Sequence, residues 1–191
     1  RFKNKKILLK KSLKNLSPKS NYSKSKYISE KLIIKMIDKK INVLVFRLPA
    51  VVAHDSFLSA FYNIKKKIKN NRLLTIMNPN QKFNGIIHVA DLIKIIIVIF
   101  KKKTQSKLNI INIASQNPEK FKDVIMQMYK LLKKTKKYDL KNHQFTNLIS
   151  INNLKKFKLK IPTVKQSIKK FILIKNLYRY LIILVLLCYR N

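Results

Sequence analysis

A single glycine, Gly85, is present among the 191 residues of this chain. Loops that wrap around phosphate groups need several glycines, because only a residue without a side chain lets the backbone approach a pyrophosphate closely. The sequence therefore contains neither the glycine-rich turn of a dinucleotide-binding domain nor a P-loop.

Residues that bind metals in proteins are equally sparse. Cys188 is the only cysteine, which excludes a disulfide framework and a cysteine-based zinc site. The three histidines, His54, His88 and His143, are scattered along the chain, which argues against a histidine-based metal site. We therefore expect no bound metal ion.

The chain is strongly basic, with 44 Lys and Arg against 7 Asp and Glu and a formal net charge of +37. A basic surface gains affinity for nucleic acids by releasing counterions from phosphates. However, 39 of the basic residues are lysine and five are arginine, whereas arginine is the residue whose planar fork reads phosphates and bases. Isoleucine and asparagine are also abundant, which indicates a coding bias. A nucleic-acid partner is disfavoured and stays an alternative.

Hydrophobic periodicity predicts helices that alternate with short strands. The predicted helices span residues 22–39, 56–69, 91–103, 118–133 and 152–157, and a last one starts at 163. The predicted strands span residues 42–47, 73–77, 85–89 and 108–114. Asp91 is expected to cap the third helix and Pro118 to open the fourth. The alternation indicates an α/β protein with a parallel sheet.

The C-terminal segment 171–189 is apolar. Its uninterrupted apolar run is about ten residues long, whereas a membrane-spanning helix needs about 20. Lys175 and Arg179 interrupt the wider segment. We expect a helix that docks on the core or lies at a membrane surface, so a membrane-surface protein is a second alternative.

Tyr22 and Lys26 lie four residues apart, which places them one turn apart on the same face of a helix. A neighbouring ammonium group stabilises a phenolate, and such a tyrosine can take the proton of an alcohol while a hydride leaves the same carbon. The spacing alone is not specific, because lysines also follow Tyr27, Tyr62 and Tyr129 by four residues. The alternative for any one pair is a solvated helix face.

The residues around Tyr22 distinguish it from the other tyrosines. Residues 18–30 match the pattern P-x-x-x-Y-x-x-S-K-x-x-x-E, with Tyr22, Ser25, Lys26 and Glu30 in place. This pattern resembles that of the extended short-chain dehydrogenases/reductases, the NAD-dependent epimerase/dehydratase family.

Further segments resemble the same family in the right order. Residues 43–54 look like its strand that ends in R-x-P-x-V-x-G, with Ala53 in place of the glycine. Residues 83–92 look like its F-x-x-x-H-V-x-D-L segment, and residues 149–172 resemble its C-terminal helix pair more loosely. The resemblance therefore covers residues 15–172.

The resemblance implies a role for each matching residue. Tyr22 would be the catalytic base and acid, and Lys26 would hold the nicotinamide ribose and stabilise the Tyr22 phenolate. The residues expected to contact the cofactor, NAD or NADP, are Tyr22, Lys26, Leu48, Pro49 and Val51. The residues expected to face a nucleotide-sugar substrate are Ala50, Asn84 and His88. A buried structural histidine is the alternative for His88.

Members of this family also have an N-terminal half with the glycine-rich turn and a catalytic Ser or Thr. The resemblance thus implies the C-terminal part of an NAD(P)-dependent epimerase, dehydratase or reductase, inactive without that half. The expected fold is the C-terminal part of a Rossmann-like parallel-sheet domain plus a small substrate-binding subdomain. The expected units are a linker (1–21), the Rossmann-like part (22–115), the substrate subdomain (116–172) and an apolar tail (173–191). We expect a cytoplasmic protein, with a homodimer and membrane contact through residues 171–189 as further candidates.

Overall fold

The computed structural model describes residues 20–36, 43–102, 108–142 and 148–174. Within them, helices alternate with short strands. The helices are α1 (Asn21–Met36), α2 (Ala60–Lys69), α3 (Val89–Lys101), α4 (Phe121–Leu132), α5 (Asn152–Lys155) and α6 (Val164–Leu173). The strands are β1 (Val43–Arg47), β2 (Ala50–Val52), β3 (Leu74–Met77), β4 (Lys82–Phe83), β5 (Ile86–His88), β6 (Leu108–Asn112), β7 (Glu119–Lys120) and β8 (Tyr138–Lys141).

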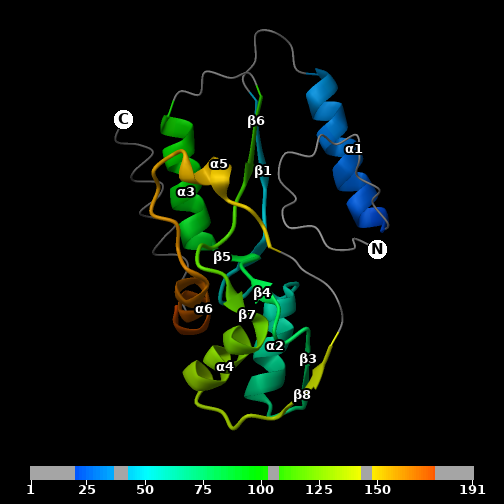
Figure 1. Ribbon diagram of the computed structural model, residues 1–191, viewed down its shortest axis with the longest axis vertical. Helices are drawn as coiled ribbons and strands as arrows, with labels where there is room; N and C mark the ends of the chain where they lie inside the picture. Colours follow the sequence, from blue (N-terminus) through cyan, green and yellow to red (C-terminus); the bar gives the residue numbers. More distant parts are fainter. Residues whose placement is uncertain (1–19, 37–42, 103–107, 143–147, 175–191) are drawn as a thin grey trace.

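Three of the strand pairs are parallel, as the alternation of helices and strands predicts. β1 pairs with β6 from Val43 opposite Leu108 to Arg47 opposite Asn112. β2 pairs with β5 and β3 with β8, whereas β4 and β7 are antiparallel. In Figure 1, α1 and α3 lie on opposite sides of the β1–β6 pair. This layering of helices on both faces of parallel strands is typical of α/β folds.

Two clusters of buried side chains form the core. The first packs α2, α4 and α6 against β2, β3 and β5, and its fully buried members include Ile68, Ile76, Ile125, Met128 and Phe171. The second packs α3, β6 and α5 together, and its fully buried members include Ile87, Ile99, Ile113 and Leu154. Burying each such side chain contributes about 1.5–3 kcal/mol, so these clusters hold most of the elements in place.

Local signals explain where several helices begin, and they correct two expectations. α3 is capped by His88, not Asp91, because the His88 ring accepts the N–H of Ala90. α4 begins at Phe121 and not at Pro118, because Glu119 and Lys120 pair with β4 as strand β7. A capping residue must precede the helix, and Asp91 lies within its first turn.

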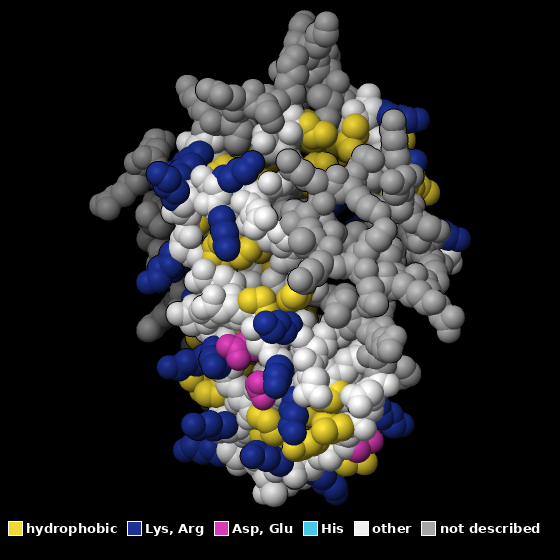
Figure 2. Space-filling model, viewed as in Figure 1, with side chains coloured by type: hydrophobic (Ala, Val, Ile, Leu, Met, Phe, Trp, Pro, Cys, Tyr) yellow, Lys and Arg dark blue, Asp and Glu magenta, His cyan; other side chains and the backbone are white. Residues whose placement is uncertain are grey.

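In the part of the face that Figure 2 colours by type, Lys and Arg side chains are scattered and do not gather into one patch. No helix of the described residues is long and apolar enough to cross a membrane. α6 ends at Leu173, and most of the apolar segment 171–189 lies outside the described residues.

Candidate active site

Tyr22 and Lys26 lie one turn apart at the start of α1. The helix begins directly after Ser20. The Ser20 hydroxyl accepts the N–H of Ser23 at 3.1 Å, and the Ser23 hydroxyl accepts the N–H of Ser20 at 3.0 Å. The Tyr22 side chain is 73% exposed, and the Lys26 Nζ lies 5.6 Å from the centre of its ring. The phenol is therefore open to a ligand, with an ammonium group beside it.

The same local geometry recurs one turn further along α1. Lys31 Nζ lies 4.6 Å from the centre of the Tyr27 ring, which is closer than the Lys26–Tyr22 contact. The Ser25 hydroxyl donates to the Tyr22 carbonyl at 2.8 Å, so it closes a helical turn. The contact between a tyrosine and a lysine thus does not by itself single out Tyr22.

Glu30 ties α1 to the strand that carries the second matching segment. Arg47 donates from Nε to Glu30 Oε2 at 3.1 Å and from Nη2 to Glu30 Oε1 at 2.5 Å. The Glu30 side chain is only 14% exposed, so this bidentate pair is partly shielded from water. The glutamate of the tyrosine segment and the arginine of the strand segment therefore bind each other.

Three residues expected to contact the cofactor, and Ala50, expected to face the substrate, follow β1. Leu48 is half exposed, and Pro49 is partly exposed. Ala50 donates its N–H to the Gly85 carbonyl at 3.1 Å, and Val51 lies opposite Ile87 in the β2–β5 pair. Leu48 is accordingly available at the surface, whereas Ala50 and Val51 are partly buried and pack against the two core clusters.

The turn after β2 closes without the glycine that the family pattern has there. Ala53 accepts the N–H of Ser56 at 3.2 Å and the Ser56 hydroxyl at 2.9 Å, and its own N–H donates to that hydroxyl at 3.2 Å. Ala53 is not among the described residues with positive φ. The Ser56 hydroxyl therefore stabilises this turn, where the family pattern has a glycine.

Asn84 lines a cavity of about 300 Å³ at the carboxyl end of β6. Its amide is already engaged, because Nδ2 donates to the Ile149 carbonyl at 2.7 Å and Oδ1 accepts the Ile149 N–H at 2.9 Å. Other polar residues that line the cavity are Ser115, Gln116, Asn117, Ser150, Asn152 and Lys155. Asn84 thus shapes the cavity wall by holding residue 149.

Apart from Asn84, the polar residues of this cavity were missed by reasoning from the sequence. Ser115 and Gln116 follow β6, and ligands of open α/β sheets bind at the carboxyl ends of the strands. That rule is the signal that could have found them. Ser150 and Asn152 come from a distant segment that only the fold brings to the same place.

His88 is fully buried, and its position differs from that of Asn84. Its Nδ1 accepts the N–H of Ala90 at 3.3 Å, its Nε2 has no partner in the described structure, and it does not line the Asn84 cavity. Burial lowers the pKa of His88 from 6.5 to about 4; the nearby Asp91 raises it by a smaller amount and Lys170 lowers it further. The imidazole is therefore neutral at neutral pH.

Asp91 forms an ion pair with Lys170, which joins α3 to α6. The Ser115 and Ser167 hydroxyls are 2.9 Å apart and connect the end of β6 to the same helix. Among the described residues, no group of three or more His, Cys, Asp or Glu side chains could hold a metal ion. These buried polar contacts fix the position of α6.

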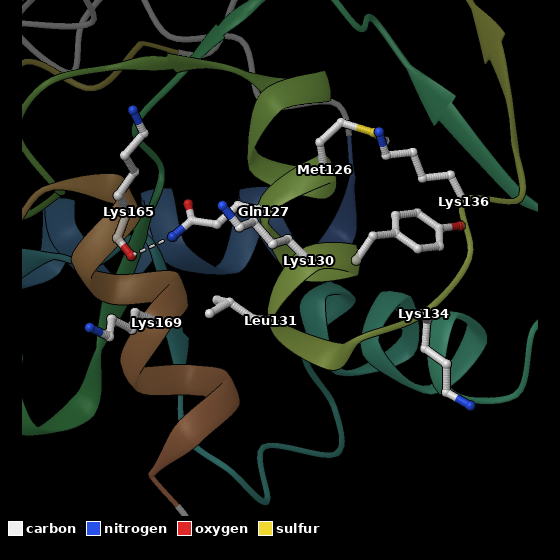
Figure 3. A pocket seen from close by; sticks show the side chains of 9 residues that line it. Met126, Gln127, Lys130, Leu131, Lys134, Lys136, Lys165 and Lys169 are labelled. Carbon is white, nitrogen blue, oxygen red and sulfur yellow. Dashed lines mark hydrogen bonds between the residues drawn. The ribbon is translucent and has the colours of Figure 1, made fainter.

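A larger groove of about 740 Å³ lies along α4 and α6 (Figure 3). Gln127 on α4 donates to the Lys165 carbonyl on α6 at 3.0 Å and bridges the two helices. The lysines that line the groove are all exposed, and they are Lys130, Lys134, Lys136, Lys165 and Lys169. Exposed ammonium groups stay hydrated, so they need no bound anion.

Comparison with known proteins decides the family. Residues 3–113, more than half of the chain, match the model of the NAD-binding family described as male sterility protein. The chain belongs to this family. No curated protein matches it significantly.

Three solved structures that resemble the chain are nucleotide-sugar enzymes. The dTDP-glucose 4,6-dehydratase from Bacillus anthracis, in complex with NAD, has a TM-score of 0.67 at 20% identity, over 82% of this chain and 52% of that one. The UDP-glucuronic acid 4-epimerase from Bacillus cereus, also in complex with NAD, has a TM-score of 0.67 at 18% identity, over 81% of this chain and 51% of that one. The UDP-N-acetylglucosamine 4-epimerase from Methanobrevibacter ruminantium, in complex with UDP-N-acetylmuramic acid, has a TM-score of 0.68 at 18% identity, over 94% of this chain and 58% of that one.

These similarities confirm the predicted Rossmann-like α/β fold and the resemblance to extended short-chain dehydrogenases/reductases. This member of the male sterility family spans about half the length of the solved structures that it matches. The comparisons give no support to the nucleic-acid-binding or membrane-surface alternatives.

Proposed function

We propose that this chain provides the Tyr–Lys acid–base pair of an NAD(P)-dependent nucleotide-sugar epimerase, dehydratase or reductase. The observation that carries the proposal is the order and joining of the matching segments. Tyr22 and Lys26 share a helix with Glu30, Glu30 binds Arg47 on the strand, and that strand leads into Leu48 and Pro49.

In this proposal Tyr22 transfers the proton of a sugar hydroxyl. Its exposed phenol can contact a bound sugar, and the Lys26 ammonium lies 5.6 Å from the centre of its ring. In the return step the same group gives the proton back, so one residue serves as base and acid. Arg47 holds Glu30 and so positions the helix that carries both side chains.

The residues expected at the nicotinamide end of the cofactor are exposed or partly exposed. Lys26 would hold the nicotinamide ribose, and the exposed Leu48 with Pro49 offers an apolar wall for the nicotinamide ring. NAD(P) supplies the hydride acceptor when bound. The only glycine, Gly85, accepts a hydrogen bond from Ala50, and this sequence offers no glycine-rich turn for the pyrophosphate.

The cavity beside Asn84 is the candidate subsite for the substrate. A hydroxyl and amides from Ser150, Gln116 and Asn152 line it, and such groups suit the many hydroxyls of a sugar. The substrate class itself rests on the nucleotide-sugar enzymes of similar fold.

The test uses the longest polypeptide that the coding sequence specifies, with this chain alone beside it. Each form is incubated with NAD⁺ or NADP⁺ and a UDP- or dTDP-sugar, and products are followed by NMR and by absorbance of the reduced cofactor. We expect conversion by the longer polypeptide and none by this chain alone. The proposal fails if neither form converts any nucleotide sugar.

A matched pair of lysine variants tests the cofactor contact. Lys26→Met should weaken cofactor binding by about tenfold, because it removes the charged donor expected at the ribose. Lys31→Met removes the same charge beside Tyr27 on the same helix and should leave binding unchanged. Equal effects of the two variants would show that only the overall charge matters.

A further inference from the structure

A small cavity of about 130 Å³ lies between α2 and the turn that follows β2. Its lining includes His54, Asp55, Tyr62, Lys65, Lys66 and Lys69. We call it the Lys65 cavity. Three of the lining residues are lysines and one is an aspartate; Lys65 is buried, unlike the lysines of the α4–α6 groove, whereas Lys66 and Lys69 are exposed.

Lys65 is buried in a way that is unusual for lysine, with only 4% of its surface exposed. Its Nζ donates to the His54 carbonyl at 3.2 Å and lies 4.7 Å from the centre of the Phe171 ring. Among the described ion pairs, none involves Lys65. Both observed partners are neutral, so the buried charge is not directly compensated.

The charges of the neighbouring residues do not compensate the Lys65 ammonium group. Burial, and then the nearby Lys69, lower the pKa of Lys65, while Asp55 opposes them. Asp55 is itself engaged, because its Oδ1 lies 2.6 Å from His54 Nδ1. A bound anion would compensate the two ammonium groups and offer an acceptor for each.

We propose that the Lys65 cavity binds the phosphate group of a small phosphate-bearing ligand. A phosphate dianion matches the excess of lysine over aspartate, and its oxygens can accept from Lys65, Lys69 and the Tyr62 hydroxyl. The cavity has room for a phosphate group but not for a nucleotide, so the remainder of the ligand lies outside it. The inference is independent of the chemistry of Tyr22.

The test is calorimetric titration of the full chain at constant ionic strength, with chloride as the balancing anion. The probes are inorganic phosphate and glycerol 3-phosphate, which distinguish a free phosphate site from one for a phosphate ester. We expect saturable binding of at least one probe at a single site. Absence of saturable binding of both probes overturns the proposal.

Three variants assign the binding to the cavity. Lys65→Met keeps an unbranched side chain over Phe171 and should weaken binding by about tenfold or more. Lys69→Met removes an exposed lysine of the same lining, so it tests the cavity even if the Lys65 variant does not fold. Lys67→Met, on α2 but outside the lining, is the charge-matched control. The proposal is wrong if Lys69→Met and Lys67→Met weaken binding equally.

Discussion

The Glu30 carboxylate accepts two hydrogen bonds from the Arg47 guanidinium, which joins α1 to β1. No side chain between Asn21 and Lys35 is buried, so α1 has little apolar packing to hold it. The two charged residues lie in separate matching segments, 17 residues apart. The ion pair therefore sets the position of the helix that carries Tyr22.

Glu30→Gln is expected to loosen α1. Removing one partner of a partly buried bidentate pair should lower the local opening free energy by about 1–2 kcal/mol. This loss corresponds to amide exchange in α1 that is about 5–30 times faster, measurable by hydrogen–deuterium exchange. Glu119→Gln is the control, since its partner Lys165 is 66% exposed and such pairs contribute little. Unchanged exchange in α1 would show that other contacts hold the helix.

The order of the elements could be predicted from the sequence because most of them carry a local signal. The Val-rich run before Pro49 became β1, and apolar spacing located α1 and α2 within a few residues. Thr163 marked the start of α6, since its hydroxyl accepts the N–H of Gln166. These signals lie within a few residues of the element that they define.

Elements without a local signal could not be predicted. β4 and β7 have two residues each and exist because Phe83 and Glu119 meet in the folded chain. β8 lies in a segment that shows no clear periodicity and forms by pairing with β3. Pairing with a distant strand decides such segments, and the sequence nearby does not report it.

The candidate site was predictable only in part for the same reason. The helical spacing of Tyr22 and Lys26 follows from their positions in the chain. The pairing of Glu30 with Arg47 depends on how α1 meets β1 in the folded chain. The capping of α3 by His88 depends on the rotamer of the His88 side chain. The roles proposed for Tyr22 and Lys26 stay predictions until activity is measured.

Stability should fall in acid because of His88. The pKa of His88 is lowered to about 4 in the folded protein from about 6.5, so the unfolded chain binds a proton that the folded chain does not. The stability is complete above the unfolded value and is lost as the pH falls from 6.5 towards 4. Linkage gives a loss of about 2 kcal/mol between about pH 7 and pH 5. Urea unfolding at a series of pH values measures it.

His88→Asn isolates this contribution, because asparagine keeps a capping oxygen for α3 but does not titrate. The variant will be less stable at neutral pH if packing is lost, yet its stability should change less between pH 7 and pH 5. The same slope in both proteins would mean that other groups cause the acid loss.

Thr163 should stabilise the last helix through its hydroxyl. Thr163 and Gln166 form a reciprocal capping box, with Gln166 Oε1 accepting the Thr163 N–H at 2.9 Å. Thr163→Ala should cost about 1 kcal/mol in the free energy of unfolding, measured with urea. Thr163→Ser keeps the hydroxyl and should cost much less. A Ser variant as unstable as the Ala variant would point to lost packing of the methyl group.

The most direct measurement compares Tyr22→Phe with Tyr27→Phe in the longest polypeptide that the coding sequence specifies. Both tyrosines lie on α1 with a lysine four residues on, and both substitutions remove one hydroxyl. Hydride transfer from a nucleotide sugar, followed by absorbance of the reduced cofactor, should fall by about 100-fold or more in Tyr22→Phe and stay near the unmodified rate in Tyr27→Phe. Comparable rates in the two variants would contradict the assignment of Tyr22 as the acid–base residue.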